Sequence, residues 1–249
     1  MLNFFEYRSI HGISPVSPRR DGLRQKGQGR QGCAALLAVT LAGAWSLANA
    51  ETGEQVAKSG NTAGAPACVT CHGAAGQGQG AAGFPRLAGM NAKYLVTQLR
   101  SFQDGTRVNP IMGPVAQMLG VADVRGLATY YAALPAVGAS GNADGSRAVV
   151  AAGEALAKNG RWTNGIPACA QCHGATGLGV GAVVPQIAGQ SVVYISNQLQ
   201  AWQVGTRKND PMGLMHGIAL KLSATDVSAV AVYYAGLPAA SAAPGQARP

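Results

Sequence analysis

Apolar side chains recur at helical spacing in two segments of the chain. Between residues 91 and 103 they occupy Tyr94, Leu95 and Leu99, a spacing that places side chains on one face of a helix. The same arrangement returns between residues 191 and 203. No segment alternates apolar and polar residues as a half-buried strand does. The pattern therefore predicts an all-α protein.

Further helices are predicted on either side of these two segments. They occupy residues 53–59, 122–133, 146–159 and 225–235. The second of them opens near Asp123, an acidic residue suited to a first helical turn, and ends before Pro135, which cannot continue a helix. Each half of the chain thus has the same predicted helices in the same order.

Sequence similarity accompanies this likeness between the two halves. The segment Gly53–Lys58 returns as Gly153–Lys158, at an offset of 100 residues, and Pro66–Gly73 returns as Pro167–Gly174, at an offset of 101. Self-similarity over nearly all of the chain beyond residue 50 is the signature of a repeat architecture. We interpret the chain as a tandem duplication of one small domain.

Residues 1–50 have the pattern of a secretory signal peptide. Basic residues precede an apolar run from Cys33 to Leu47, and residues 48–50 offer a small-residue cleavage site. The run is too short and too rich in alanine for a membrane span, which needs about 20 strongly apolar residues. The stretch before it is long for a signal peptide, which indicates a start placed too far upstream.

The remaining boundaries follow from the repeat. We expect a first domain at 51–135, a linker at 136–147, a second domain at 148–238 and a disordered tail at 239–249. The linker is rich in Gly, Ala, Ser and Asn, as connecting segments are. With few Phe and Trp residues, a domain of this size buries a thin core. We therefore expect a cofactor, a metal or a partner to fill its centre.

Each predicted domain contains one C-x-x-C-H motif, the attachment signature of c-type haem. The two thiols add to haem vinyl groups as thioethers, and the adjacent histidine reaches the iron, so the spacing must suit one rigid macrocycle. The motifs are Cys68/Cys71/His72 and Cys169/Cys172/His173. The chain is expected to hold two haem c groups, with both histidines as axial ligands of iron.

Other uses of paired cysteines fit the sequence less well. The gap between the two pairs far exceeds the ligand spacing of a structural zinc site. Thioredoxin-like chemistry requires a βαβ setting, which the pattern lacks. Disulfides form in an oxidising compartment, yet both pairs would then be followed by histidine through coincidence.

The sixth ligand of each iron decides between an electron carrier and a reactive site. A methionine thioether saturates the iron and raises its reduction potential. A frame shared by the two repeats aligns Met112 with Met215, which are the predicted ligands, whereas Met118 aligns with a lysine. Met212 remains a rival in the second repeat, and His216 is a weaker alternative.

Two prolines and two arginines are predicted to lie near the haems. A haem-ligating histidine normally donates its other ring N–H to a carbonyl, and Pro85 and Pro185 follow their histidines by 13 and 12 residues. Arg107 and Arg207 precede the methionine segments. For these arginines, contact with haem propionates and a solvated surface position remain alternatives.

The net charge of +9 does not indicate nucleic-acid binding. Six of the 19 basic and two of the 10 acidic residues lie in residues 1–50, which leaves +5 for the rest of the chain. Two haems with two propionates each bring this remainder close to neutral. We therefore expect no nucleic acid as a partner, and the predicted methionine ligation of both irons separately leads us to expect no small-molecule substrate.

With these motifs placed, the sequence resembles the class I cytochromes c and, more closely, the dihaem cytochrome c₄ family. The resemblance covers residues 51–238 and rests on the paired C-x-x-C-H-G motifs, the P-x-[LI]-A-G segments and the Tyr-Tyr pair of each closing helix. It implies two tandem domains, each a few helices around a covalent haem, facing each other about a pseudo-twofold axis with their propionate edges close together. It also implies that Gly53 and Gly153 let the first helix of each domain pack closely against an aromatic residue of the last.

The same resemblance implies a function. Members of the family are periplasmic carriers, often membrane-associated, that pass single electrons from a quinol-oxidising complex or a dehydrogenase towards a terminal oxidase. We predict this role, and an electron-transfer protein in place of an enzyme. Two alternatives stay open, namely a dihaem peroxidase, which needs one displaceable iron ligand, and a dedicated cytochrome subunit of a dehydrogenase.

The two repeats differ most in their methionine segments. Met112 lies three residues after Asn109, whereas Met215 lies six residues after Asn209. The two segments must therefore differ in shape. We hypothesise that the two haems have unequal reduction potentials.

Overall fold

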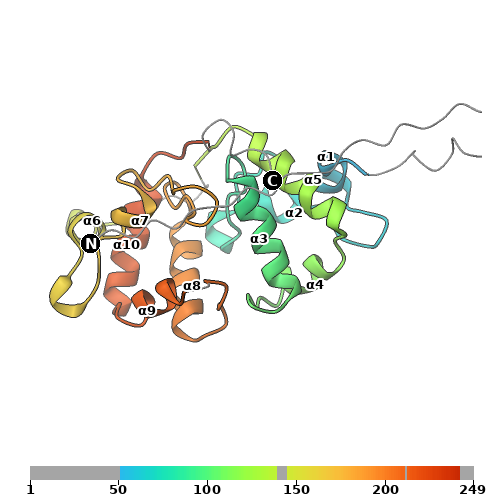
Figure 1. Ribbon diagram of the computed structural model, residues 1–249. Coiled ribbons are helices and arrows are strands. Elements are labelled where there is room, and N and C mark those ends of the chain that lie inside the picture. Colours follow the sequence, from blue (N-terminus) through green and yellow to red (C-terminus); the bar gives the residue numbers. More distant parts are fainter. Residues whose placement is uncertain (1–50, 139–144, 211, 242–249) are drawn as a thin grey trace, which may run out of the picture. The chain divides into compact units, whose positions relative to one another are not determined.

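The computed structural model describes residues 51–138, 145–210 and 212–241 (Figure 1), and within them the chain is helical. Pairs of residues form isolated β-bridges, and no strand occurs in this described part. The predicted all-α class is confirmed. The predicted signal peptide, residues 139–144 of the predicted linker and residues 242–249 of the predicted tail lie outside the described residues.

Within the described residues the two repeats share the same order of α-helices, but the short 3₁₀ helix follows the second α-helix in the first repeat and precedes it in the second repeat. The first has α1 (Gly53–Ser59), α2 (Val69–His72), the 3₁₀ helix η1 (Gly80–Ala82), α3 (Ala92–Gln103), α4 (Met112–Gln117) and α5 (Val121–Ala133). The second has α6 (Arg147–Asn159), the 3₁₀ helix η2 (Trp162–Asn164), α7 (Ala170–His173), α8 (Val192–Gln203), α9 (Leu214–Ala219) and α10 (Ala224–Gly236). In Figure 1 the first set runs from blue to green and the second from yellow to red.

The long helices begin where side chains cap them. The side chain of Asn91 accepts a hydrogen bond from the Tyr94 N–H of α3, and Ser191 does the same for Tyr194 of α8, each at 3.1 Å. Such caps satisfy backbone donors that a first helical turn leaves without partners. The predicted helices are confirmed to within one residue at each end. The short helices α4 and α9 were not predicted, because six residues are too few to display a periodic pattern.

The first helix of each repeat packs directly on the backbone of the last. A Cβ atom at Gly53 in α1 would collide with the carbonyl of Gly126 in α5. In α6, a Cβ atom at Gly153 would collide with the carbonyl of Ala229 and would lie 2.9 Å from the Cβ of Tyr233. The expected close approach therefore occurs in both repeats. An aromatic side chain borders the glycine in the second repeat, whereas backbone borders it in the first.

Each repeat has its own small hydrophobic core. In the first, Val56, Leu127 and Tyr131 are buried between α1, α3 and α5. In the second, Leu156 and Tyr234 hold the corresponding places between α6, α8 and α10. Among the described residues, no helix is long and apolar enough to cross a membrane.

Candidate functional site

The C-x-x-C-H motifs form single helical turns that present cysteine and histidine together. In α2 the carbonyl of Cys68 accepts the His72 N–H at 2.9 Å, and in α7 the carbonyl of Cys169 accepts the His173 N–H at 2.9 Å. The next residue, Gly73 in the first repeat, has φ of 82°, which only glycine adopts without strain. The chain therefore turns sharply away as soon as the histidine has been placed.

Both motif histidines are buried and held by the predicted proline carbonyls. Nδ1 of His72 lies 2.9 Å from the oxygen of Pro85, and Nδ1 of His173 lies 2.9 Å from the oxygen of Pro185. A carbonyl oxygen only accepts, so Nδ1 must carry the proton in each ring. Burial lowers the pKa of both histidines, against the raising effect of the carbonyl contact. Each imidazole is therefore neutral, with a lone pair on Nε2 available to a metal.

One cavity of about 1060 Å³ brings the predicted site residues together. Its volume lies just above the range for single ligand pockets, about 300–1,000 Å³, and both repeats contribute to its wall. The lining includes every predicted residue, namely Cys68, Cys71, His72, Pro85, Arg107, Met112, Cys169, Cys172, His173, Pro185, Arg207 and Met215. The geometry thus assembles residues that lie up to 147 positions apart in the sequence.

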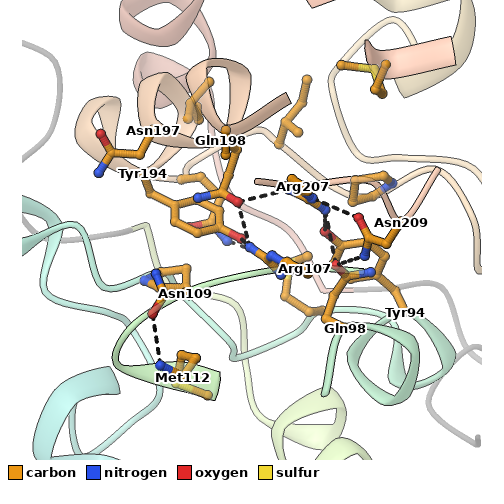
Figure 2. Close-up of a pocket in the computed structure, with 18 of the residues that line it drawn as sticks. Tyr94, Gln98, Arg107, Asn109, Met112, Tyr194, Asn197, Gln198, Arg207 and Asn209 are labelled. Carbon is orange, nitrogen blue, oxygen red and sulfur yellow. Dashed lines mark hydrogen bonds between the residues drawn. The ribbon is translucent and has the colours of Figure 1, made fainter. Parts of the chain in front are cut away.

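The methionine segments differ between the two repeats in structure as well as in length. Met112 begins α4, and its N–H donates to the Asn109 side chain at 2.8 Å, as Figure 2 shows. Met215 lies in α9 and packs against the core of the second repeat. Its rival Met212 also lines the cavity but is 79% exposed. The structure therefore favours Met215 over Met212 as the residue positioned for a buried iron.

The weaker alternatives lie outside the cavity lining. Met118 is exposed and does not border the cavity. His216 does not border it either, and its Nδ1 lies 2.8 Å from the carbonyl of Trp202. Neither side chain is placed to act on the same cofactor as the motif histidines.

Arg107 and Arg207 are buried in a polar cluster formed by both repeats (Figure 2). Arg107 donates to Gln98 of its own repeat at 3.0 Å, and to Tyr194 and Gln198 of the other repeat at 2.9 and 2.6 Å. A solvated surface position, one of the two alternatives for these arginines, does not fit this burial.

The contacts of Arg207 repeat this arrangement with the repeats exchanged. Arg207 donates to Gln198 at 3.0 Å, to Tyr94 at 3.2 Å and to Gln98 at 3.1 Å. Beside it, the Asn209 amide donates to Gln98 at 2.8 Å. An interface in which each side offers the same contacts to the other is characteristic of twofold symmetry. We call these residues, Tyr94, Gln98, Arg107, Tyr194, Gln198, Arg207 and Asn209, the arginine cluster.

A short backbone pairing accompanies the arginine cluster. The N–H of Val108 donates to the Thr206 carbonyl, and the N–H of Lys208 donates to the Thr106 carbonyl, both at 2.7 Å. Arg107 and Arg207 face each other across this antiparallel bridge. Reciprocal backbone bonds fix the register of the two repeats, so the cluster forms one defined arrangement.

The charge distribution of the cavity wall fits an anionic, largely apolar cofactor. The guanidinium groups of Arg86, Arg107 and Arg207 line the cavity and are buried, and among the described residues none has a carboxylate within ion-pair distance. Burial, with the neighbouring Arg107 charge, lowers the pKa of Arg207. Buried charges are normally paired. Haem propionates are the counterions that such a wall would accept.

A buried donor on the same wall supports this fit. The indole Nε1 of Trp202 has no hydrogen-bond partner within the described part of the chain, and Trp202 lines the cavity. Buried donors are nearly always satisfied. A bound acceptor such as a carboxylate would meet this requirement.

The sequence did not single out Arg86 or Gln190 as functional residues. Arg86 is 1% exposed and Gln190 is 2% exposed, and they bond to each other between the repeats. Each occupies a place in the repeat where the other copy has a different residue. This difference between the copies could have marked the two residues in the sequence. Their role, however, depends on which residues contact each other between the repeats.

Comparisons with known proteins agree with the fold. The family model for cytochrome c matches residues 50–134. The chain is 47% identical over 174 residues to the thiosulfate dehydrogenase electron acceptor of Thiomonas intermedia, covering 70% of this chain and 80% of that protein. It is 45% identical to the protein of the same name from Stutzerimonas stutzeri, covering 76% and 88%. Cytochrome c4 of Pseudomonas aeruginosa is 38% identical, covering 70% and 85%.

Solved structures show the same similarity. Thiosulfate dehydrogenase (TsdBA) from Marichromatium purpuratum superimposes with a TM-score of 0.70 at 42% identity, covering 75% of this chain and 40% of that one. Reduced cytochrome c4 from Pseudomonas stutzeri superimposes with a TM-score of 0.63 at 32% identity, covering 68% and 93%. The match thus spans less than half of the first structure and nearly all of the second.

Proposed function

The chain belongs to the dihaem cytochrome c₄ family, and on this premise we propose that it accepts single electrons from a thiosulfate dehydrogenase and passes them to an oxidase-type acceptor in the periplasm. Membership of this family establishes the general function. The chain is an electron-transfer protein of cytochrome c fold, with haem c as its covalent cofactor. The haem supplies one-electron oxidation and reduction, and the protein determines where and at what potential this occurs.

Each repeat provides one complete set of haem-binding side chains. We assign the thioether bonds to Cys68 and Cys71 in the first repeat and to Cys169 and Cys172 in the second. His72 and His173 are the proximal ligands, since each is neutral and presents a free Nε2 while its Nδ1–H is held by a carbonyl. This contact fixes the orientation of the ring and its strength as a donor.

The distal ligands are assigned to Met112 and Met215. Both line the same cavity as the motif histidines, each follows the motif histidine of its own repeat in the sequence, and both precede the same shared sequence frame. An iron that holds histidine and methionine has no open position, which favours electron transfer over reaction with a small molecule. This ligand set supports a carrier and argues against a peroxidase.

The arginine cluster is assigned to the propionates. Its two guanidiniums bring buried positive charge to the place where the repeats meet. Carboxylates placed against them would be paired there and shielded from water. This cluster would hold the propionates of both haems, and the haems would supply the transfer of an electron between the two repeats.

The donor rests on one observation, the identity of 47% and 45% to two thiosulfate dehydrogenase electron acceptors over at least 80% of each. Identity to cytochrome c4 of Pseudomonas aeruginosa is 38%. The structural similarity to TsdBA points to the same donor class. A cytochrome c4 role, with a quinol-oxidising complex as donor, is the second candidate and is favoured by the solved cytochrome c4 structures.

The donor is tested by mixing the oxidised, haem-loaded protein with a purified thiosulfate dehydrogenase and thiosulfate. Reduction is followed through the absorption band of ferrous haem, with cytochrome c4 of Pseudomonas aeruginosa as the comparison. We expect rapid reduction that requires both dehydrogenase and thiosulfate and that exceeds the rate of the comparison protein. Equal rates for the two proteins would reject the thiosulfate donor and leave the cytochrome c4 role.

Location is tested separately by cell fractionation. The signal pattern in residues 1–50 supports export to the periplasm. We expect the haem-loaded chain in the periplasmic fraction, and release from membranes by salt if it is peripherally associated. Retention in the cytoplasm without haem would reject the proposed location.

A further inference from the structure

The peptide group between Pro85 and Arg86 receives hydrogen bonds from both sides. Its carbonyl, on Pro85, accepts Nδ1–H of His72 at 2.9 Å. Its N–H, on Arg86, donates to Oε1 of Gln190 at 3.0 Å. Gln190 belongs to the second repeat and His72 to the first. A continuous chain of hydrogen bonds thus runs from one repeat to the histidine of the other.

Gln190 is held firmly in this position. Its Nε2 donates to the Arg86 carbonyl at 2.8 Å. The oxygen and the nitrogen of the side-chain amide thus each form a hydrogen bond with the backbone of Arg86. The two partners determine which end is which, because an N–H requires an acceptor and a carbonyl requires a donor. Arg86 and Gln190 are 1% and 2% exposed, so water does not compete for these bonds.

The side chain of Arg86 keeps the peptide in place. Its Nη1 donates to the carbonyl of Ala88 at 2.5 Å and its Nη2 to the carbonyl of Ala188 at 3.1 Å. These two carbonyls come from different repeats. The backbone that carries the Pro85–Arg86 peptide is therefore fixed relative to Gln190 by a second, independent set of bonds.

The positions that correspond to Arg86 and Gln190 in the other repeat hold different residues. The repeat puts Met90 where the second copy has Gln190, and Gln186 where the first has Arg86. A thioether is a weak acceptor and has no N–H, and Met90 receives only a long contact of 3.8 Å from Gln190. The direct bonds of the two histidines are equal at 2.9 Å. The residues behind the proline carbonyl differ between the repeats, as the methionine segments do.

We propose that Gln190 is a positioning residue for His72, acting through the Pro85–Arg86 peptide, so that a side chain of the second repeat tunes the haem of the first. Bonds in a chain polarise one another in a buried site. Acceptance of the Arg86 N–H makes the Pro85 carbonyl a stronger acceptor for Nδ1–H of His72. The imidazole becomes a stronger donor at Nε2, which favours ferric iron and lowers the reduction potential of that haem.

The inference rests on the proposed ligand role of His72 and is tested by redox titration of the dihaem protein. Gln190→Met places in the second repeat the residue that the first repeat has at this position. We expect one of the two midpoint potentials to rise and the other to stay unchanged. Gln190→Glu keeps an acceptor on the Arg86 N–H and makes it stronger. We expect that variant to lower the midpoint that Gln190→Met raises.

Met90→Leu is the matched control. It conserves volume in a buried position, a change that cores usually tolerate, and leaves both bonds between Gln190 and Arg86 in place. We expect both midpoints to match those of the unchanged protein. The opposite signs of the two Gln190 variants separate tuning from damage, since loosening of the contact between the repeats would move the midpoints in the same direction in both.

The inference is overturned if Gln190→Met leaves both midpoint potentials unchanged or moves both by the same amount. It is also overturned if Gln190→Met and Gln190→Glu move the same midpoint potential in the same direction. Failure of the proposed function has a separate signature. A chain that holds fewer than two haems, or that keeps its ferric spectrum in His72→Ala, would reject the ligand assignment itself. An intact dihaem spectrum with unmoved potentials would reject the role of Gln190 alone.

Discussion

At the scale of single residues, the methionines separate into two classes by their surroundings. Met112 and Met215 border the cavity and are partly buried, whereas Met118 and Met212 are exposed at 39% and 79%. A ligand to buried iron must be held in one geometry, which burial provides. The repeat frame predicts Met112 and Met215, and their placement supports that assignment.

Replacing each methionine by leucine tests the assignment. Met112→Leu and Met215→Leu each remove one thioether while conserving volume, so one haem should lose its sixth ligand and its midpoint potential should fall. We expect the long-wavelength ferric band that marks methionine ligation to decrease by about half in each variant. Met118→Leu and Met212→Leu are the controls and should retain the full band. A full band in Met215→Leu with a halved band in Met212→Leu would transfer the assignment to Met212.

At the scale of elements, the close packing of the first helix against the last requires a glycine in each repeat. Gly53 of α1 lies against the backbone of Gly126, and Gly153 of α6 lies against Ala229. Backbone cannot move aside as the end of a flexible side chain can. The helices must therefore separate if a Cβ atom is added, which opens the core of that repeat.

Gly53→Ala and Gly153→Ala test this packing. We expect each to destabilise the protein by about 1–3 kcal/mol, the range for overpacking of a core, as measured by thermal or denaturant unfolding of the haem-loaded chain. Gly236→Ala in α10 is the control, because a Cβ atom there meets open space and alanine favours a helix by about 1 kcal/mol. Equal stability of Gly53→Ala and Gly236→Ala would show that α1 does not pack as described.

The start of α10 contains an ion pair whose strength depends on pH. Asp226 accepts two hydrogen bonds from the guanidinium of Arg161, at 3.1 and 2.6 Å, and one from the Ser223 N–H at 3.0 Å. Arg161 holds the pKa of Asp226 down to about 2, against the raising effect of burial. The first repeat has Asn61 at 2.9 Å from Asp123 in this place, a neutral partner.

This difference predicts a loss of stability in acid. A carboxyl with a lowered folded pKa stabilises the fold fully above its unfolded value of about 3.9 and loses that contribution as pH falls towards about 2. Arg161 is 44% exposed, so we expect Asp226→Asn to cost about 1 kcal/mol near neutral pH. Unfolding measured between pH 7 and 2 should show the difference between the variant and the unchanged chain vanish at low pH. A difference that persists at pH 2 would assign the cost to helix capping instead.

At the scale of the whole molecule, the arginine cluster joins the two repeats electrostatically. Each guanidinium bonds to both repeats. A charge shared in this way is expected to act on both haems, whereas the effect proposed for Gln190 is on the haem of the first repeat. Buried positive charge stabilises ferrous over ferric iron, because reduction adds a negative charge.

Arg107→Met and Arg207→Met test this shared role. We expect each to lower both midpoint potentials and to destabilise the protein by about 3 kcal/mol, since removing one partner leaves buried polar groups without bonds. Redox titration and unfolding measure the two effects. Arg100→Met, on the exposed side of α3, should change neither. A fall in only one midpoint would show that the guanidinium serves a single haem.

The sequence by itself determined which residues are candidates for the site. Residues that must meet one rigid macrocycle have a fixed spacing, and the duplication displays that spacing twice, so the motif cysteines and histidines, Met112 and Met215 were readable from the repeat. The long helices were equally readable, because their apolar faces and caps are local features. Motif spacing, apolar helix faces and helix caps each involve residues close together in the sequence, so the sequence displays them.

Tertiary structure alone decided what the copies do to each other. Whether Arg107 faces solvent or the second repeat depends on contacts between residues about 90 positions apart, and no local pattern encodes them. The same holds for Gln190 and Arg86, separated by 104 positions. Hydrogen bonds between buried groups form only when folding brings the two surfaces together. The likeness of the repeats and the difference between their methionine segments were therefore visible in the sequence, whereas the contacts that join the two repeats were decided by the fold.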